Sequence, residues 1–326
     1  MWVIDDTKFP NKGSIEEKLL FLIRYGVLAP NILNTQPWKF EIKKNKIVVY
    51  PDISKKLKHL DPEGRQLWIS LGSAIENIII AGEHFGLVGK EKVSSKKISI
   101  HFKTDRKRIN KLFHFITKRV TNKRKAKRIL FDNGETTKLK KLPFEKHTNA
   151  FLLEKESDMK QFIKMVDSGD DIIYSNEKIK NEIIFWSRFN RYNMYKTNDG
   201  IPYRTMGIPS VSTRVGKIFM SFFLSPKYIK KSDEQKIMNS SGVIIITSKK
   251  DCNKCWIKTG RTLERILLEL TSFGMSYSFL NQPCQVKRLR TRLKKITKDW
   301  PQIIIRVGYA KTAAHTQRKI LEEVLK

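Results

Sequence analysis

The sequence contains little cysteine, few acidic residues for its size and no long apolar run. Three cysteines among 326 residues are too few for a disulfide framework, which makes a reducing cytoplasm the default location. The longest apolar runs, such as 78–80 and 218–224, are far too short to span a bilayer. The first residues include Asp5 and Asp6 and no apolar stretch, so they do not read as a signal peptide. We therefore expect a soluble, cytoplasmic protein.

The shortage of acidic residues leaves a large excess of positive charge. The chain has 65 lysines and arginines against 32 acidic residues, which gives a formal net charge of +33. Such a charge suggests affinity for nucleic acid, anionic lipid or a phosphorylated ligand. Because the charge is spread over the whole length, we interpret it as compositional drift with a preference for phosphate as a side effect. Nucleic-acid binding ranks last, since helix-turn-helix, zinc-knuckle and aromatic RNA-binding motifs are absent.

One stretch of the chain occurs twice, at 68–87 and at 256–275. The copies align without a gap, and most other apolar positions differ only by exchange among Ile, Leu and Met. The identical positions are Trp68/Trp256, Ile69/Ile257, Gly72/Gly260, Glu76/Glu264, Ile78/Ile266, Phe85/Phe273 and Gly86/Gly274. The repeat predicts two copies of one domain, each with a central helix. Chance similarity between two buried helices is the alternative interpretation.

The repeated positions carry structural expectations. Small residues at Gly72 and Gly260 would let a second helix approach closely. Glu76 and Glu264 lie within mostly apolar helices and therefore need polar partners. We expect each carboxylate to make a structural hydrogen bond rather than to act in catalysis, because the residue is present in both copies.

Local patterns predict the remaining elements. Residues 14–17 form a capping box that opens a helix, which Pro30 ends. Alternating apolar residues predict a hairpin around the Lys44-Asn45 turn. The apolar run 218–224 reads as a helix lying over a pocket. Further helices are predicted at 106–118, with Ile109 on the apolar face, at 171–189 and at 286–296, and strands at 97–102, 149–154, 242–248 and 302–309.

A motif in the first half carries a family resemblance. Residues 29–38 read APNILNTQPW, which resembles the A-P-S-x-x-N-x-Q-P-W signature of the flavin-dependent nitroreductases, with Asn31 where that family usually has serine. The resemblance implies a loop that reaches one side of a flavin mononucleotide (FMN) across a dimer interface. The implied cofactor-binding residues are Pro30, Asn31, Asn34 and Gln36. A buried Trp38 that anchors the hairpin, with polar residues satisfying the loop backbone, is the alternative.

A second motif begins at Arg119. Residues 119–124 read RVTNKR and resemble the R-x-S/T-x-R/K motif that nitroreductases use for the FMN phosphate and the polar edge of its ring. Arginine makes planar, charge-assisted bonds to phosphate. The resemblance assigns FMN contacts to Arg119, Thr121 and Asn122, and places Lys123 near N1 and O2 of the ring, where it can stabilise the reduced flavin. A solvated basic run is the alternative.

The C-terminal part carries weaker signs of the same family. Gly274, Met275 and Ser276 stand where nitroreductases have a Gly-Leu-Gly-type loop against the flavin, although Met275 and Ser276 depart from it. Residues 301–309 resemble the family's terminal strand, which ends in Gly-Tyr. Arg318 and Lys319 follow at the place where the family carries basic residues for the FMN phosphate.

The motifs are divided between the two copies, so together they supply one complete FMN site at the interface between copies. This arrangement resembles the fused tandem nitroreductases of the Acg type. We expect an α+β fold with two pseudo-symmetric halves, each a mostly antiparallel sheet flanked by helices. The predicted halves are 1–105 and 106–326, with a lid-like insertion at about 157–225. Because fusion makes the dimer interface internal, the chain can be a monomer.

The implied function is an FMN-dependent oxidoreductase that uses NAD(P)H and passes electrons to an unknown small-molecule acceptor. The flavin carries the chemistry, so no side chain is assigned as catalytic. A flavin-binding protein without turnover is the alternative, because a closed lid would bar the nicotinamide. No membrane partner is expected, and the sequence does not distinguish NADH from NADPH.

The cysteine pair Cys252 and Cys255 forms a CxxC motif between a predicted strand and the second central helix. With no second pair and no neighbouring histidine, we expect no zinc site. The setting is close to that of a redox pair at a helix N-terminus, but the nitroreductase resemblance requires no cysteine. The role of the pair is left open.

Overall fold

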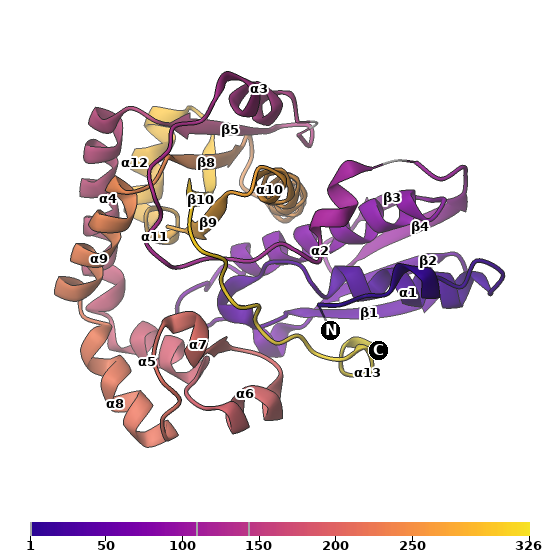
Figure 1. Ribbon diagram of the computed structural model, residues 1–326, viewed down its shortest axis with the longest axis horizontal. Helices are drawn as coiled ribbons and strands as arrows, with labels where there is room; N and C mark the ends of the chain where they lie inside the picture. The colour runs from indigo at the N-terminus through magenta and orange to yellow at the C-terminus, as the bar shows by residue number, and fades with distance from the viewer. Residues whose placement is uncertain (1, 109, 143) are drawn as a thin grey trace.

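The computed structural model describes residues 2–108, 110–142 and 144–326. Its fold is α+β, as predicted, and it is built on two four-stranded antiparallel sheets (Figure 1). The first sheet has the order β1-β2-β4-β3. Its strands are β1 (Trp38–Lys43), β2 (Lys46–Pro51), β3 (Leu87–Val93) and β4 (Ile98–Thr104).

The second sheet repeats this arrangement later in the chain. Its order is β5-β8-β10-β9. In both sheets, therefore, the strands lie side by side in the order first, second, fourth, third, counted along the chain. Its strands are β5 (Thr148–Leu153), β8 (Gly242–Ser248), β9 (Ser276–Phe279) and β10 (Trp300–Gly308). Every pairing in both sheets is antiparallel. Most residues of β8 and β10 are buried, which explains their continuous isoleucine and valine runs.

Two long helices, α2 (Arg65–His84) and α10 (Asn253–Ser272), pack against each other between the sheets (Figure 1). They contain the two copies of the sequence repeat. A Cβ atom added to Gly72 would overlap the carbonyl oxygen of Ile257, and one added to Gly260 would overlap that of Ile69. The expected role of the two glycines is therefore confirmed, because only glycine allows the backbones this close.

The N-terminal helix α1 (Ile15–Gly26) packs on α2. Ser14 accepts a hydrogen bond from the backbone of Glu17, and the Glu17 carboxylate accepts from the backbone of Ser14 at 2.7 Å, which is the predicted capping box. The buried face of α1 includes Leu19, Leu22 and Ile23, all with no exposed surface. The predicted hairpin is also present, since β1 and β2 pair through Lys43 and Lys46.

A helical insertion separates β5 from β8, where the first half has only the hairpin turn between β1 and β2. Its helices form the left and lower edges of Figure 1 and bury a small apolar cluster around Phe189, to which Leu57 and Leu60 of the first half also belong. They are α4 (Glu156–Tyr174), α5 (Glu177–Phe185), α6 (Arg191–Thr197), α7 (Tyr203–Met206), α8 (Thr213–Phe223) and α9 (Pro226–Met238). A two-stranded parallel pair, β6 (Ser187–Arg188) and β7 (Ile201–Pro202), lies among them.

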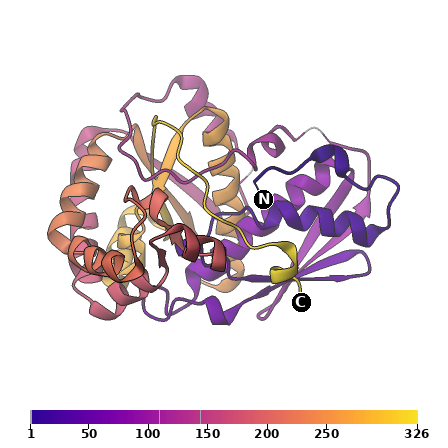
Figure 2. The same cartoon turned by 60° about the horizontal axis from the view of Figure 1, so that its bottom comes forward.

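The C-terminal segment leaves the second sheet and returns to the first half. The backbone N–H of Lys326 donates to the carbonyl of Phe40 in β1 at 2.8 Å, and both chain ends lie beside the first half in Figure 2. The remaining helices are α3 (Asn133–Lys141), α11 (Gln282–Gln285), α12 (Lys287–Thr297) and α13 (Leu321–Val324). Within the described ranges, no helix has the combined length and apolar character needed to cross a membrane.

Two of the predicted helices are wrong in extent. The helix at 106–118 is reduced to a 3-10 helix, Lys111–Phe115, because Asn110 is extended and its side chain accepts from the backbone of Leu112. Ile109, which that prediction used, lies outside the described residues. The helix at 171–189 is broken, since the Asn176 side chain caps the start of α5. The sequence patterns also failed to indicate β3, whose residues alternate weakly.

Candidate active site

A cavity of about 960 Å³ lies between the central helices, the inserted helices and the C-terminal segment. Ile69 of α2 and Leu263 of α10 line it from the centre, and Phe219 and Met220 of α8 line it from the insertion. Its volume is at the upper end of the range of about 300–1,000 Å³ that is typical of small-molecule and cofactor sites. The space is therefore large enough for a ligand of cofactor size.

Arg119 lies at the inner end of this cavity with 1% of its surface exposed. Its guanidinium donates to the Tyr277 hydroxyl at 3.1 Å and to the carbonyl of Leu28 at 2.6 Å. The Nε atom lies 3.3 Å from Oε1 of Glu264. Burial opposes the charged form, but Tyr277 and Glu264 outweigh it and raise the pKa of Arg119. The group is thus held as a buried cation.

Arg318 enters the same region from the C-terminal segment. It donates to the carbonyls of Leu28 and Ala29 at 3.2 and 3.1 Å and to Oδ1 of Asn34. Its Nε atom has no hydrogen-bond partner in the part of the chain that the structure describes. Burial and the neighbouring Arg119 lower its pKa to about 9. The two guanidinium groups share the Leu28 carbonyl, so the site has an excess of positive charge that suits an anion.

An aromatic pair covers the two arginines. The indole of Trp2 stacks on the ring of His315 with centroids 4.1 Å apart. The guanidinium carbons of Arg318 and Arg119 lie 5.0 and 5.8 Å from the Trp2 ring centroid. Burial and the two arginines lower the pKa of His315 to about 4, so its ring is neutral at pH 7. The pair therefore encloses the cationic end of the cavity without adding charge.

The loop at 29–38 joins three parts of the chain through its polar side chains. Asn31 accepts from the backbone N–H of Gln36 at 2.8 Å. Asn34 donates to the carbonyls of Gly200 and Gln317 at 2.9 and 3.1 Å. Gln36 donates to the carbonyl of Asn198 at 2.7 Å and accepts from a backbone N–H of the C-terminal segment at 2.8 Å. The loop is thus held to both the insertion and the C-terminal segment.

The second motif is divided between the cavity and its support. Thr121 and Lys123 line the cavity. Asn122 is buried and donates to the carbonyl of Lys311 at 2.8 Å and to Ser276 at 3.1 Å. Desolvation and then Lys236 lower the pKa of Lys123. An anion beside Lys123 would offset both effects.

The cavity brings together about half of the residues proposed from the sequence. Within the described part of the chain, its lining includes Pro30, Asn31, Asn34, Arg119, Thr121, Lys123 and Arg318. The residues that fall outside the lining are Gln36, Asn122, Gly274, Met275, Ser276 and Lys319. Gly274 has a positive φ of 70° and Met275 is 4% exposed, so these two terminate α10 and fill the core beside the cavity.

A polar cluster on the insertion side has no counterpart in the sequence motifs. The side chain of Gln282 donates to Asp170 and to Asp233, both at 2.9 Å, and Lys236 lies 3.3 Å from Asp233. Burial and the neighbouring Asp233 raise the pKa of Asp170 to about 8. The only sequence signal was the three-residue spacing of Asp233 and Lys236, which is common on any helix.

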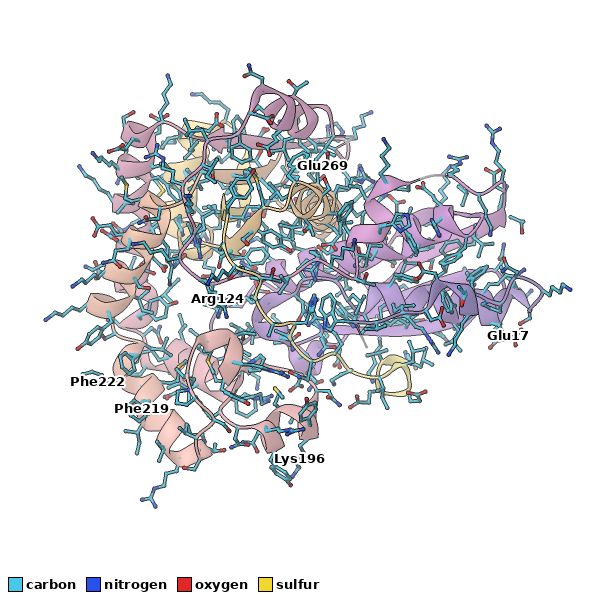
Figure 3. All side chains as sticks on the ribbon, viewed as in Figure 1. Glu17, Arg124, Lys196, Phe219, Phe222 and Glu269 are labelled. Carbon is cyan, nitrogen blue, oxygen red and sulfur yellow. The ribbon has the colours of Figure 1, made fainter. Side chains whose placement is uncertain are left out.

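Helix α8 forms an outer wall of the cavity. Phe219, Met220 and Phe223 border the cavity, but Phe219 is also 54% exposed, close to the 64% and 61% of Ile218 and Phe222. Figure 3 shows Phe219 and Phe222 at the outer edge of the insertion. The predicted helix over a pocket at 218–224 is confirmed, and it presents apolar side chains to both the cavity and the outside.

The comparisons with known proteins add a full-length relationship. A scan against models of protein families finds no match. Two proteins of Mycobacterium tuberculosis, from strains CDC 1551 and H37Rv and each named "Putative NAD(P)H nitroreductase", are 21% identical to this chain. Each alignment spans 98% of this chain and 93% of the relative. The chain is similar to the nitroreductases. The resemblance seen in the motifs is confirmed by this match, which extends through the insertion.

Solved structures resemble parts of the nitroreductase-like chain. Iodotyrosine deiodinase bound to FMN and 3-iodo-L-tyrosine has 13% identity and a TM-score of 0.39, over 64% of this chain and 95% of that one. A BluB-like flavoprotein from Clostridium difficile 630 has 13% identity and a TM-score of 0.40, over 65% of this chain and 96% of that one. Because these TM-scores are low, the fold is assigned from the sheets and helices of the structure and not from these similarities.

Proposed function

We propose that this chain is an FMN-dependent oxidoreductase that transfers electrons from NAD(P)H to a small-molecule acceptor. The observation that carries the proposal is the convergence of three separate segments on one cavity. Asn31 and Asn34 come from the first half, Arg119 and Lys123 from the segment after β4, and Arg318 from the C-terminal segment. These segments include the motifs that resemble the nitroreductase cofactor site, and the similarity to the named nitroreductases supports the same activity.

The residues present fit the phosphate of FMN. Among the described residues, the Nε of Arg318 has no hydrogen-bond partner, and it lies beside a second buried arginine, Arg119. Such a pair can bind a dianionic phosphate. Hydroxyl and ammonium groups are available from Thr121 and Lys123 in the same cavity. When bound, FMN supplies a ring that accepts a hydride and passes the electrons on.

The chain's own groups then have four tasks. Arg119 and Arg318 hold the anionic end of the cofactor, and Asn31 and Asn34 keep the loop at 29–38 in place. Lys123 keeps positive charge in the cavity, where it favours an anionic reduced ligand. Apolar side chains of α2, α8 and α10 line the rest of the space and would displace water from the ring of a bound cofactor. No side chain is required to act as an acid or base in the electron transfer.

A flavin-sequestering protein is the second candidate, and the insertion favours it. Helices α8 and α9 cover the cavity with apolar side chains, including Phe219 and Phe223. A cover that does not open would retain FMN and keep the nicotinamide out. The two functions therefore share the cofactor site and differ only in whether the cover moves.

The same strand order in both sheets supports a further part of the proposal. The chain would consist of two fused copies, and the interface that joins two subunits in a dimer would lie within one chain. Residues 1–105 and 106–326 would be the copies, and 157–225 the inserted lid, although the inserted helices run from Glu156 to Met238. An internal junction requires no second chain, so the proposal includes a monomer. NAD(P)H and a small acceptor are its proposed partners, in the cytoplasm.

An absorbance spectrum of the purified chain, followed by anaerobic addition of NADPH, tests the function. The oxidoreductase predicts a flavin band of about one equivalent per chain that bleaches on addition. Retention of the oxidised band with NADPH and with NADH would support sequestration. A chain that takes up no FMN even when it is supplied in excess would contradict both candidates.

A further inference from the structure

The cysteine pair of the second half lies outside the cavity lining and forms a separate cluster at the start of α10. Cys252 is exposed and is the N-cap residue of this 20-residue helix. Cys255 is half-buried one turn later, and the two sulfur atoms lie 3.0 Å apart. Both are free thiols, so a small approach of the sulfurs would bring them to the bonding distance of about 2.05 Å.

Lysines surround this pair on two segments of the chain. Lys249, Lys250 and Lys254 are exposed in the turn before α10 and in its first residues. Lys258 follows one turn later and donates to the carbonyl of Lys146 at 3.4 Å. The only acid of this turn that could neutralise them, Asp251, is instead paired with a buried arginine of α12 at 2.5 Å. The cluster therefore stands in a strongly positive field.

A neighbouring histidine lies among the same lysines. His147 precedes β5 and accepts through its carbonyl from the backbone of Lys249 at 3.0 Å. Burial and then Lys146, Lys258, Lys249 and Lys250 lower its pKa, which means that an added positive charge is disfavoured there. The N-terminus of α10 adds partial positive charge of its own. A negatively charged reagent is consequently attracted to Cys252.

We propose that Cys252 and Cys255 form a redox-active dithiol that exchanges electrons with anionic, low-molecular-weight disulfides. Cys252 is the attacking thiol because it is exposed at the helix N-terminus, and Cys255 is the resolving thiol. Burial and the contact with the Cys252 sulfur raise the pKa of Cys255 to about 11, so Cys255 stays protonated until the first exchange has taken place. Within the described residues no group of three metal-ligating side chains is present, so the pair has no third ligand there.

The reaction balances as two thiol–disulfide exchanges. The Cys252 thiolate attacks one sulfur of the external disulfide, whose S–S bond breaks and releases one thiolate. Cys255 then loses its proton to solvent and attacks the Cys252 sulfur, which releases the second thiolate and closes the Cys252–Cys255 bond. The protein loses two protons and two electrons, and the external disulfide becomes two thiols. The reverse sequence reduces the pair again.

The test uses the full chain, reduced and then exposed anaerobically to oxidised glutathione, with intact mass measured after alkylation. After alkylation, the oxidised wild-type chain should carry two alkyl groups fewer than the reduced chain, keep no glutathionyl group and regain both thiols in dithiothreitol. Cys255→Ser should accumulate one glutathionyl group on Cys252. Cys252→Ser should react at least about tenfold more slowly than Cys284→Ser, the matched control, whose missing thiol is buried in the wild type.

The charge requirement is tested with cystamine, a cationic disulfide of similar reactivity. At low salt, oxidised glutathione should react about tenfold faster than cystamine, and added salt should reduce this ratio. A chain that keeps three free thiols with both reagents overturns the dithiol. A stable glutathionyl adduct on the wild-type chain overturns the resolving role of Cys255. Equal rates for the two disulfides overturn the preference for an anionic partner.

Discussion

The two sides of the central helix pair differ in what faces the repeated glutamate. On one side, Glu76 of α2 accepts from Arg261 of α10 at 2.7 Å and also from Arg265. The same two arginines pair with Glu91 and Glu145 at 2.6 to 3.1 Å. Three carboxylates and two guanidinium groups therefore close this side of the junction with a dense ionic network.

On the other side, the aligned carboxylate has no arginine across the helix pair. The positions of α2 that correspond to the two arginines of α10 are Ser73 and Asn77. Glu264 is therefore paired with Arg119, which comes from the segment after β4. Burial raises the pKa of Glu264 to about 7, although Arg119 and Asn77 oppose this. The cavity opens next to this pair.

The repeat keeps the contact between the two helices, while the residues around each glutamate decide whether that side is filled or open. A buried carboxylate needs a cation wherever it lies. On the Glu76 side, α10 supplies two arginines, and the ionic network fills the space. On the Glu264 side, the cation is Arg119 from the segment after β4, which lines the cavity together with the insertion and the C-terminal segment.

The largest effect is expected from a substitution that disrupts the packing of α2 on α10 and therefore both sides of the helix pair. Gly260→Ala adds a methyl group that overlaps the carbonyl oxygen of Ile69, and the helices must separate, which should cost more than about 3 kcal/mol of unfolding free energy. Gly274→Ala is the control: nothing lies within 4 Å of its added Cβ, so only the backbone strain of roughly 1 kcal/mol is expected. Urea unfolding measures both, and equal costs would contradict the close approach of α2 and α10.

A smaller effect is expected when one arginine is removed from either side, and its size should differ between the two sides. Arg119→Met removes the cation of Glu264 together with the donors to Tyr277 and Leu28, so it should cost about 3 kcal/mol. Arg265→Met should cost about 1 kcal/mol, because Arg261 still pairs with Glu76 at 2.7 Å. Unfolding free energies at one pH provide the measurement. A lower stability of the Arg265 variant would contradict the idea that Glu264 depends on one arginine whereas Glu76 shares two.

The pH dependence of stability sharpens the comparison further. Raising the pKa of Glu264 from its ordinary 4.5 to about 7 makes the folded chain bind more protons than the unfolded chain between these values. Stability from this group is therefore present below pH 4.5 and is lost as pH rises through 7, by at most about 3 kcal/mol. Glu264→Gln should show a flatter profile over this range in unfolding experiments from pH 4.5 to 8. Parallel profiles would contradict the raised pKa.

Sequence patterns predicted the elements whose signals are local. The capping box at Ser14, the hairpin at Lys44, the strand β8 and both central helices depend on neighbours within a few positions, so their residues specify them directly. The repeat also predicted the close approach of a second helix at Gly72 and Gly260, because small residues stand at the same position of both copies. The helix expected at 106–118 failed because one local cap, Asn110, outweighed its apolar spacing.

The cavity was predictable only in part, for a different reason. Motif resemblance indicated Arg119 and Arg318, but their actual partners lie far away in the chain. The stacking of Trp2 on His315 joins residues near opposite ends, and the Asp170–Asp233–Gln282 cluster joins three helices. Contacts of this kind depend on how the insertion packs, for which the sequence offers no periodic signal.

The smallest effect distinguishes two neighbouring basic residues that the motifs treated alike. Arg318 lines the cavity, and its Nε has no partner in the described parts of the chain, whereas Lys319 falls outside the lining. Under the proposed function, Arg318→Ala should weaken FMN binding about tenfold, or about 1.4 kcal/mol, while Lys319→Ala should leave the affinity within about twofold. Titration of the flavin-free chain with FMN, followed by fluorescence quenching, measures both. Removing Arg318 also relieves Arg119 of a like charge, so the chain should stay folded, and a circular dichroism spectrum checks this. Equal losses in the two variants would mean that the phosphate is bound by the field of the C-terminal segment rather than by the Arg119–Arg318 pair.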